Sequence, residues 1–378
     1  MKKGRTLQEI SQQILVENKA KKDYLAETSA LNMTVVADGN TPDGEPTPRD
    51  VALEFTVKND KCVYKPTGLC LDQIAARVGI PAKYAERMRT EAPELLCQNV
   101  NHWFRQKPET RLLRTLSNGH KVARAFLGNG YRPFDNFDLF AAVMPKLEAA
   151  GCVIRSAEIT ERRFYIQAST PRLTSVIEQN VKIGTHQRIQ RTVEAGVIIG
   201  NSEVGFGSLF VDPIMYDLVC TNGLILERTL KRHHVGRRNE GGILGDADTA
   251  ELFSDETRRL DDKAFWAKVS DVVGAALNEI KFNENIDRLR RLQKHELAAD
   301  ATAIPTVVEA VSKRFDLAEK EKANLLLHFA QGGDFSQYGL LNAVTRTAED
   351  VDSYDRAVEL ERFGGQIIEL APSDLTLN

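Results

Sequence analysis

The 378-residue chain lacks the patterns that mark membrane proteins and disulfide-stabilised secreted domains. No apolar run approaches the roughly 18 residues that a membrane-spanning helix needs. The N-terminal stretch MKKGRTLQEISQQI has basic residues but no apolar core behind them, so it is not typical of an export signal. The 5 cysteines form no C-x-x-C pair and are odd in number, which argues against a zinc ribbon or a complete disulfide framework. These absences predict a soluble cytoplasmic protein that does not enter a membrane.

Recognisable catalytic and metal-binding motifs are also missing. The 7 histidines form no H-x-x-x-H or H-E-x-x-H pattern, and no G-x-S-x-G occurs. The glycine-rich GNSEVGFGS (residues 200–208) lacks the Gly-Lys-Ser/Thr ending of a phosphate-binding loop, so we expect a bulged or turning strand. Carboxylates of Glu158, Glu194, Glu203 and Asp212 could still converge on metal ions, since such convergence needs no local motif. The sequence therefore assigns no catalytic residue, metal or cofactor, and it favours a binding protein over an enzyme.

Positive and negative charges are segregated along the chain, although the formal net charge is only -3. Residues 101–134 hold seven basic residues and one acidic residue, a net charge of +6. Residues 299–378 hold seven basic and fourteen acidic residues, a net charge of -7. The stretch RTLKRHHVGRR (residues 228–238) has five Lys or Arg, two His and no acid. A polyanionic partner is compatible with this chain, because the local field and not the total charge steers binding.

Hydrophobic periodicity predicts an α+β protein with a central, mostly antiparallel sheet, packed helices and a helical C-terminal part. Residues 1–50 are expected to form an N-terminal helix, over residues 6–27, and a Pro/Gly-rich linker. Residues 51–240 are expected to form the α+β core domain, and residues 255–378 the helical region.

Turn and cap signals predict several elements within the core. An Asn-Gly pair at 118–119 is typical of a tight hairpin between two strands. Asp135 and Gly151 are placed to begin and end a helix, and a second hairpin is expected around Thr160 and Glu161. Four helices are expected between residues 256 and 331, and a further one over 350–365.

The basic stretches are interleaved with aromatic residues, which favours a single-strand nucleic-acid groove. Phosphates need cations, and unstacked bases need flat apolar faces. The alternative is that the aromatic residues belong to the core and the cations to a solvated face, and the sequence leaves both open. The candidate interface consists of Trp103, Arg105, Arg111, Arg114, Arg124, Tyr131, Arg132, Arg188, Arg191, Lys231, Arg232, His233, Arg237 and Arg238.

An ordered set of short stretches carries a resemblance to a known family. YRPFDNFDLF, GNSEVGFGS, YDLVCTNGL, HHVG and NAVTRTAEDVDSYDRAVELERFGG resemble the phage/plasmid-like proteins grouped as domain of unknown function 932. The resemblance covers most of the chain after residue 50. Because that family has no firmly assigned activity, the resemblance implies no catalytic residues. It implies a protein of a mobile element, encoded near single-strand binding and recombination functions.

These observations predict a nucleic-acid-binding protein of a phage or plasmid, specifically a single-strand DNA binding or annealing factor. Exposed sheet edges make a homo-oligomer possible. Two alternatives stay open. One is a metal-dependent DNA-processing enzyme such as a nuclease, and the other is a counter-defence factor that binds host proteins through the acidic C-terminal helices.

Overall fold

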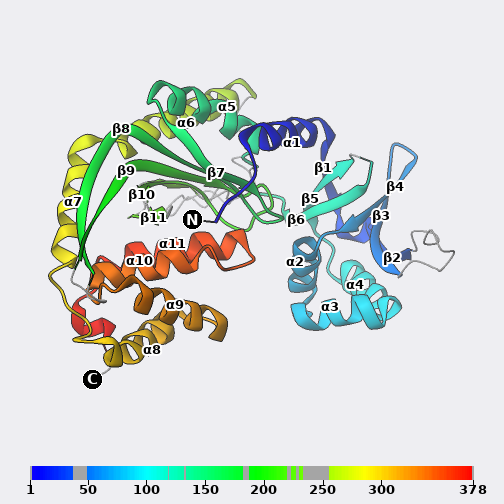
Figure 1. Cartoon of the computed structure of the whole chain (residues 1–378). Coiled ribbons are helices and arrows are strands. Elements are labelled where there is room, and N and C mark those ends of the chain that lie inside the picture. Colours follow the sequence, from blue (N-terminus) through cyan, green and yellow to red (C-terminus); the bar gives the residue numbers. More distant parts are fainter. Residues whose placement is uncertain are drawn as a thin grey trace, which may run out of the picture.

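In the computed structural model the described strands form two β-sheets with helices packed against them (Figure 1). The structure describes residues 2–36, 49–117, 119–131, 133–181, 187–218, 223–226, 230–232 and 255–376. The predicted α+β class is confirmed, and the C-terminal part is helical as expected. Among the described helices, none combines the length and the hydropathy that crossing a bilayer requires.

The first sheet comes from the N-terminal third of the chain and lies on the right of Figure 1. Its order is β1-β5-β6-β4-β3-β2, with antiparallel neighbours except for the parallel pair β4 and β6. Helices α2, α3 and α4 cover one face, where Leu53, Phe104 and Phe126 are buried. The bounds are β1 Lys21–Glu27, β2 Asn32–Val36, β3 Asp50–Val57, β4 Asp60–Pro66, α2 Gly68–Val78, α3 Ala82–Glu91, α4 Pro93–Gln106, β5 Thr110–Ser117 and β6 Lys121–Gly128.

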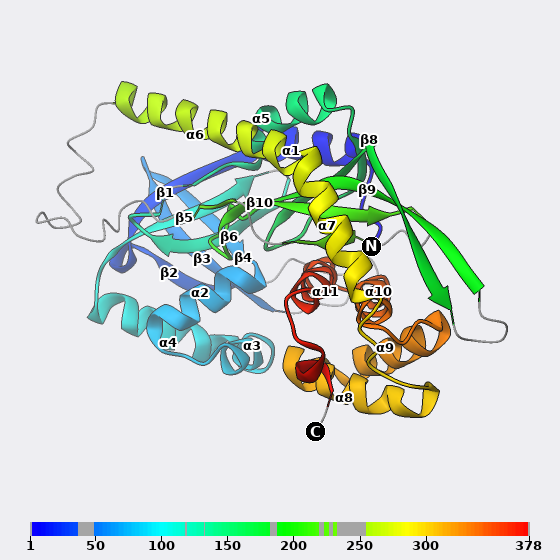
Figure 2. The same cartoon turned by 90° about the vertical axis from the view of Figure 1, so that its left-hand side faces the viewer.

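The second sheet is antiparallel and follows the order β11-β10-β9-β8-β7, with β12 pairing with β10 as well. Figure 2 shows β8 and β9 running on beyond the other strands as a two-stranded ribbon. The bounds are β7 Val153–Ile159, β8 Phe164–Val181, β9 Gln187–Asn201, β10 Leu209–Asp217, β11 Gly223–Ile225 and β12 Leu230–Arg232.

Helices cover both faces of the second sheet. Helices α1, α5 and α6 pack on one face, around Ile14, Leu139 and Phe265. Helix α11 packs on the other face through Tyr354 and Val358, while α7 to α10 share a further apolar cluster with the ends of β9 and β10. The bounds are α1 Leu7–Ala20, α5 Asn136–Ala149, α6 Asp255–Ala276, α7 Glu279–Leu292, α8 Ile304–Phe315, α9 Glu319–Gly332, α10 Gln337–Thr347 and α11 Tyr354–Ile367.

The structure differs from the sequence-based expectation in several places, among them a helix end, a whole helix and a helix cap. The predicted helix over residues 6–27 ends at Ala20, because the next seven residues form β1 and pair with β5. Helix α10 was not expected. Asp135 makes no capping hydrogen bond to α5, since its carboxylate faces Arg114 and Lys21 instead.

The predicted division at residue 50 stays a prediction about folding units, and pairing crosses it. Strands β1 and β2 of the first segment pair with β5 and β3. Helix α1, from the same segment, packs on the second sheet through Ile10 and Ile14. The first fifty residues therefore supply two strands to the first sheet and a helix that covers the second.

Candidate nucleic-acid interface

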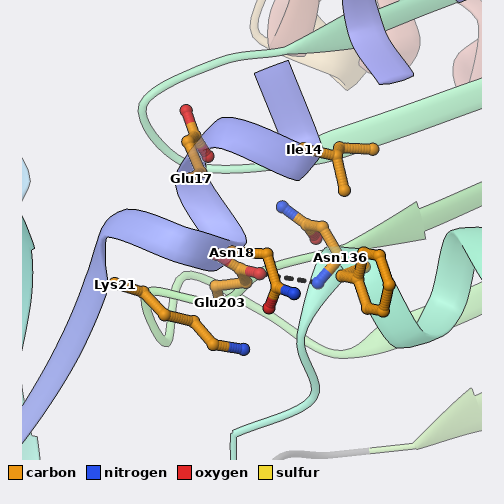
Figure 3. Close-up of a pocket in the computed structure, with 7 residues that line it drawn as sticks. Ile14, Glu17, Asn18, Lys21, Asn136 and Glu203 are labelled. Atoms are coloured by element: carbon orange, nitrogen blue, oxygen red, sulfur yellow. Dashed lines mark hydrogen bonds between the residues drawn. The ribbon is translucent and has the colours of Figure 1, made fainter. Parts of the chain in front are cut away.

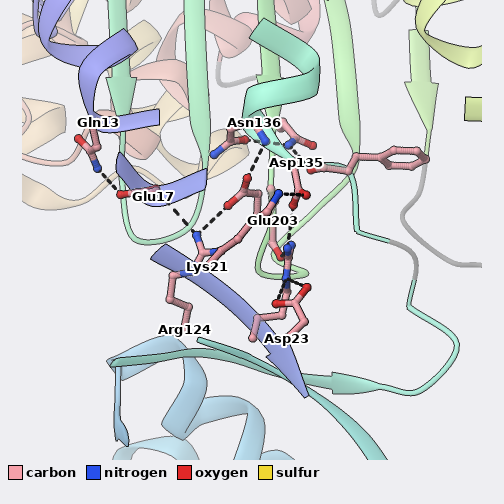
Figure 4. Close-up of polar contacts among 12 residues, drawn as sticks. Gln13, Glu17, Lys21, Asp23, Arg124, Asp135, Asn136 and Glu203 are labelled. Carbon is pink, nitrogen blue, oxygen red and sulfur yellow. Dashed lines mark hydrogen bonds and ion pairs between the residues drawn. The ribbon is translucent and has the colours of Figure 1, made fainter. Parts of the chain in front are cut away.

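A network of buried ion pairs joins the two sheets, and it contains Arg114, one of the predicted phosphate contacts (Figure 4). Arg114 on β5 is 0% exposed. Its guanidinium group donates to Asp23 at 3.1 Å, to Asp135 at 2.7 Å and to the main-chain carbonyl of Glu203 at 2.8 Å. Burial alone would lower the pKa of Arg114, but the carboxylates of Asp135 and Asp23 outweigh it and raise the pKa. Arg114 is therefore committed to the junction and is not open to a phosphate.

Arg124 on β6 belongs to the same junction. Its Nη1 lies 2.7 Å from Glu203 Oε2 and 3.9 Å from Glu17 Oε2, and the main-chain N–H of Asn136 donates to Glu203 Oε1 at 2.6 Å. A small recess, with room for little more than a water molecule, lies beside these groups (Figure 3). Because both signs of charge line so small a recess, it does not suit a nucleotide. The lining residues are Ile14, Glu17, Asn18, Lys21, Asn136, Phe137 and Glu203.

Three more of the predicted arginines also face carboxylates. Arg111 pairs with Glu109 and lies over the Phe126 ring, 5.6 Å from its centroid. Arg191 is buried and lies 2.8 Å from Asp217. Arg188 on β9 is 76% exposed in its side chain and lies 3.7 Å from Glu178. The partners are Glu109, Glu178 and Asp217, of which Asp217 is buried.

The remaining predicted residues are dispersed. Trp103 is 42% exposed on α4, and Arg105 on the same helix donates to Asn32 Oδ1 at 3.1 Å. Tyr131 donates from its hydroxyl to the Ser202 carbonyl at 3.0 Å, and burial raises its pKa. Lys231 and Arg232 lie on β12, where only their backbone positions are described. Outside the described residues lie Arg132, His233, Arg237 and Arg238.

The expected open trough of cations is therefore not formed by the described arginines of β5 and β6. Arg111, Arg114 and Arg124 each have a carboxylate within ion-pair distance. Attraction to phosphate depends on positive charge that the protein has not already neutralised. These three side chains form ion pairs within the protein. An interface for nucleic acid therefore has to lie elsewhere on the surface.

The four carboxylates that could have served a nuclease are also engaged by arginines. Glu158 lies 2.6 Å from Arg5, and Glu194 lies 2.6 Å from Arg155. Glu203 pairs with Arg124 at 2.7 Å, and Asp212 pairs with Arg362 at 2.8 Å. In the parts of the chain that the structure describes, no three His, Cys, Asp or Glu side chains are grouped so as to hold a metal ion.

An exposed aromatic residue in contact with two arginines lies in the connection from β9 to β10, for which the sequence predicted only a bulged or turning strand. Phe206 is 40% exposed. The guanidinium carbons of Arg162 and Arg163, from the turn between β7 and β8, lie 4.5 Å and 5.6 Å from the centroid of its ring. Within the described part of the chain, neither guanidinium group forms an ion pair with a carboxylate. We call Arg162, Arg163 and Phe206 the Phe206 platform.

The Phe206 platform continues into the interior as alternating rings and cations. Arg163 also lies over the buried ring of Phe210, at 5.9 Å, and Arg362 of α11 lies over the same ring at 5.0 Å. Arg362 in turn pairs with Asp212 at 2.8 Å. Arg163 therefore connects the exposed ring to the buried Phe210 ring, against which Arg362 also packs.

Glycines allow the close packing around Phe206. A Cβ atom at Gly207 would lie 1.9 Å from Arg163 Nη2, so a larger residue would displace that guanidinium group. Gly205 has φ +76°, a left-handed conformation that favours glycine, and its Cβ position would be 2.5 Å from Leu127. The sequence signal was present in the pair Arg162-Arg163 within a hairpin turn and in a phenylalanine between two glycines.

The start of the basic stretch lies beside this platform. In the pairing of β12 with β10, Arg232 lies opposite Leu209 and Lys231 opposite Phe210. Leu209 follows directly after the β9–β10 connection that carries Phe206. The backbone therefore brings residues 231 and 232, which are far from Arg162 in sequence, to the same end of the second sheet.

No protein-family model, curated protein or solved structure matches the chain. The resemblance to the phage/plasmid-like family therefore stays a prediction from the sequence.

Proposed function

We propose that the protein binds single-stranded nucleic acid at the Phe206 platform. The observation that carries the proposal is an exposed ring in contact with two guanidinium groups that no described carboxylate neutralises. A base stacks on the exposed part of such a ring whatever its identity, and the two cations beside it attract the neighbouring phosphates. Single strands are preferred because bases within a duplex are already stacked on one another and do not present a free face.

The basic stretch supports the same location. Its residues Lys231 and Arg232 lie on β12 at the end of the sheet where Phe206 emerges. A lysine and an arginine at these positions would extend the path of the nucleic-acid backbone beyond a single nucleotide. A role in binding or annealing DNA for a phage or plasmid rests on the resemblance of the sequence, and assembly into a homo-oligomer remains part of that proposal.

The proposal places the protein in the cytoplasm, where nucleic acid is accessible and thiols stay reduced. The acidic C-terminal helices as a docking surface for a host protein form the alternative class, and a failure to bind nucleic acid would favour it.

Replacing Phe206 tests the proposal directly. Phe206→Ala should weaken binding of a labelled single-stranded oligonucleotide at least about fivefold in fluorescence anisotropy, because stacking of one base contributes about 1–3 kcal/mol. Tyr84→Ala is the matched control, because Tyr84 on α3 is 49% exposed against 40% for Phe206 and lies outside the candidate interface. We expect less than a threefold effect from the control. Equal affinities for the wild type and Phe206→Ala would contradict the proposal.

A further inference from the structure

We infer that helix α2 of the first sheet positions both halves of the Phe206 platform, with Gln73 and Glu161 as the positioning residues. The inference rests on the proposed function, since it concerns how that site is held in shape. The inference goes beyond the proposed function because it gives the N-terminal region of the chain a role in binding that requires no contact with nucleic acid.

The first half of the platform is the turn that carries Arg162 and Arg163. The main-chain N–H of Leu69, in the first turn of α2, donates to Glu161 Oε1 at 2.6 Å. Glu161 directly precedes the two arginines, so this hydrogen bond fixes the base of the turn. A carboxylate is favoured at this place because the first N–H groups of a helix have no partners within the helix and carry partial positive charge.

The second half is the connection that carries Phe206. Gln73 lies one helical turn after Leu69 on α2, and its Nε2 donates to the Val204 carbonyl at 2.7 Å. The Oε1 of the same side chain accepts from the main-chain N–H of Phe126 on β6 at 2.7 Å. One amide group therefore ties the connection to both a helix and a strand of the first sheet.

Apolar packing around Val204 reinforces these hydrogen bonds. Val204 is 5% exposed and belongs to a cluster with Leu69, Leu112, Ala125 and Leu127, all from the first sheet or α2. The connection is thus embedded in the first sheet on one side while Phe206 stays exposed on the other. A loosened contact at residue 204 would allow the ring to leave the two guanidinium groups.

The variant Gln73→Glu separates positioning from a general structural role. It keeps an oxygen that accepts from Phe126 but replaces the donor to the Val204 carbonyl with an acceptor. Gln98→Glu, the same chemical change at an exposed position of α4, is the control. A second pair of variants examines the other half: Glu161→Gln retains the acceptor for Leu69, whereas Glu161→Ala removes it.

Two measurements are made on each full-length variant: hydrogen–deuterium exchange of residues 160–163 and 201–208 without nucleic acid, and anisotropy with a single-stranded oligonucleotide. We expect Gln73→Glu to speed exchange in 201–208 and to weaken affinity, each about tenfold, the effect of one hydrogen bond. Exchange in β6 should stay unchanged, and Glu161→Gln should restore most of the affinity that Glu161→Ala loses.

The outcomes distinguish a failure of the positioning role from a failure of the proposed function. If the wild type binds but Gln73→Glu matches Gln98→Glu in exchange and affinity, the positioning role is wrong while the platform stands. Gln73→Glu could instead speed exchange in β6 as much as in residues 201–208 and lower the unfolding free energy. In that case the role of Gln73 is structural, and the inference also fails. If the wild type binds no oligonucleotide, the proposed function fails and the inference fails with it.

Discussion

Replacing Glu361 with glutamine tests whether the protein keeps a buried carboxyl group protonated near neutral pH. Glu361 on α11 is 1% exposed, and Gln167 Nε2 donates to its Oε2 at 2.8 Å. The other oxygens of the pair, Glu361 Oε1 and Gln167 Oε1, are buried without a hydrogen-bond partner, and both face Gly223. When Glu361 is ionised, neither of these two oxygens has a hydrogen to share with the other. A protonated carboxyl group supplies one.

The size of the stability change follows from the raised pKa of Glu361. Burial raises the pKa of Glu361 to about 7, from an ordinary value of 4.5. The unfolded chain releases this proton near 4.5, so between these pH values the native state binds more protons and the unfolding free energy falls as pH rises. The loss is complete above pH 7 and absent below 4.5. At about 1.4 kcal/mol per pKa unit it amounts to about 3 kcal/mol.

The amide introduced by Glu361→Gln donates to Gln167 Oε1 at every pH, so the variant should lack this pH dependence. In urea unfolding at pH 5, 6, 7 and 8, the stability of the variant relative to the wild type should rise by about 2.5 kcal/mol across the series, because part of the effect already lies below pH 5. Glu359→Gln, at an exposed position on the same helix, should show no such trend. A stability difference independent of pH, or a variant less stable than the wild type at pH 8, would refute the reasoning.

Two further substitutions probe the packing that supports the site. Arg114→Met should lower the unfolding free energy by about 3–5 kcal/mol, because it removes the cation from Asp23 and leaves Asp135 with Lys21 alone; a loss under 1 kcal/mol in urea unfolding would show that electrostatic attraction does not stabilise the junction. Gly200→Ala should cost about 1–3 kcal/mol, since its Cβ would lie 2.3 Å from the Phe210 ring. Oligonucleotide affinity should fall with it, because Arg163 stacks on that ring, and an unchanged melting temperature and affinity would count against this packing.

Elements with strong local signals could be predicted from the sequence. The helix Asn136–Ala149 ends before Gly151, whose φ of +65° explains why glycine stands there. Hairpins form between β5 and β6 and between β7 and β8, as the turn residues indicated. In each case the residues that decide the structure lie within a few positions of one another.

Elements decided by distant packing could not be predicted in this way. The sequence KKDYLAE continues a helical composition, but pairing with β5, whose residues lie about ninety positions away, makes it the strand β1. Helix α10 is buried on most sides: only Asn342 and Arg346 of Gln337–Thr347 are not buried, and the buried side includes the polar residues Gln337, Thr345 and Thr347, so its apolar stripe is interrupted in the sequence.

The same limit applies to the candidate site. Composition showed that cations and aromatic rings occur together, but whether an arginine is free depends on carboxylates that the fold brings from elsewhere. Arg114 meets Asp23 and Asp135, which are 91 and 21 positions away. Arg162 and Arg163 meet no such partner among the described residues. The number of positive charges in a stretch therefore did not identify the surface that carries unneutralised charge.

The most direct test of nucleic-acid binding at the Phe206 platform is the salt dependence of affinity for a single-stranded oligonucleotide. For single strands the logarithm of the association constant falls with the logarithm of salt concentration by about 0.7 per phosphate neutralised. The double variant Arg162→Gln, Arg163→Gln should therefore reduce the slope by about 1.4. Lys83→Gln with Arg87→Gln, an equal loss of charge on the exposed face of α3, should leave it unchanged. Binding that is absent or insensitive to salt, or equal slopes for both double variants, would contradict the account.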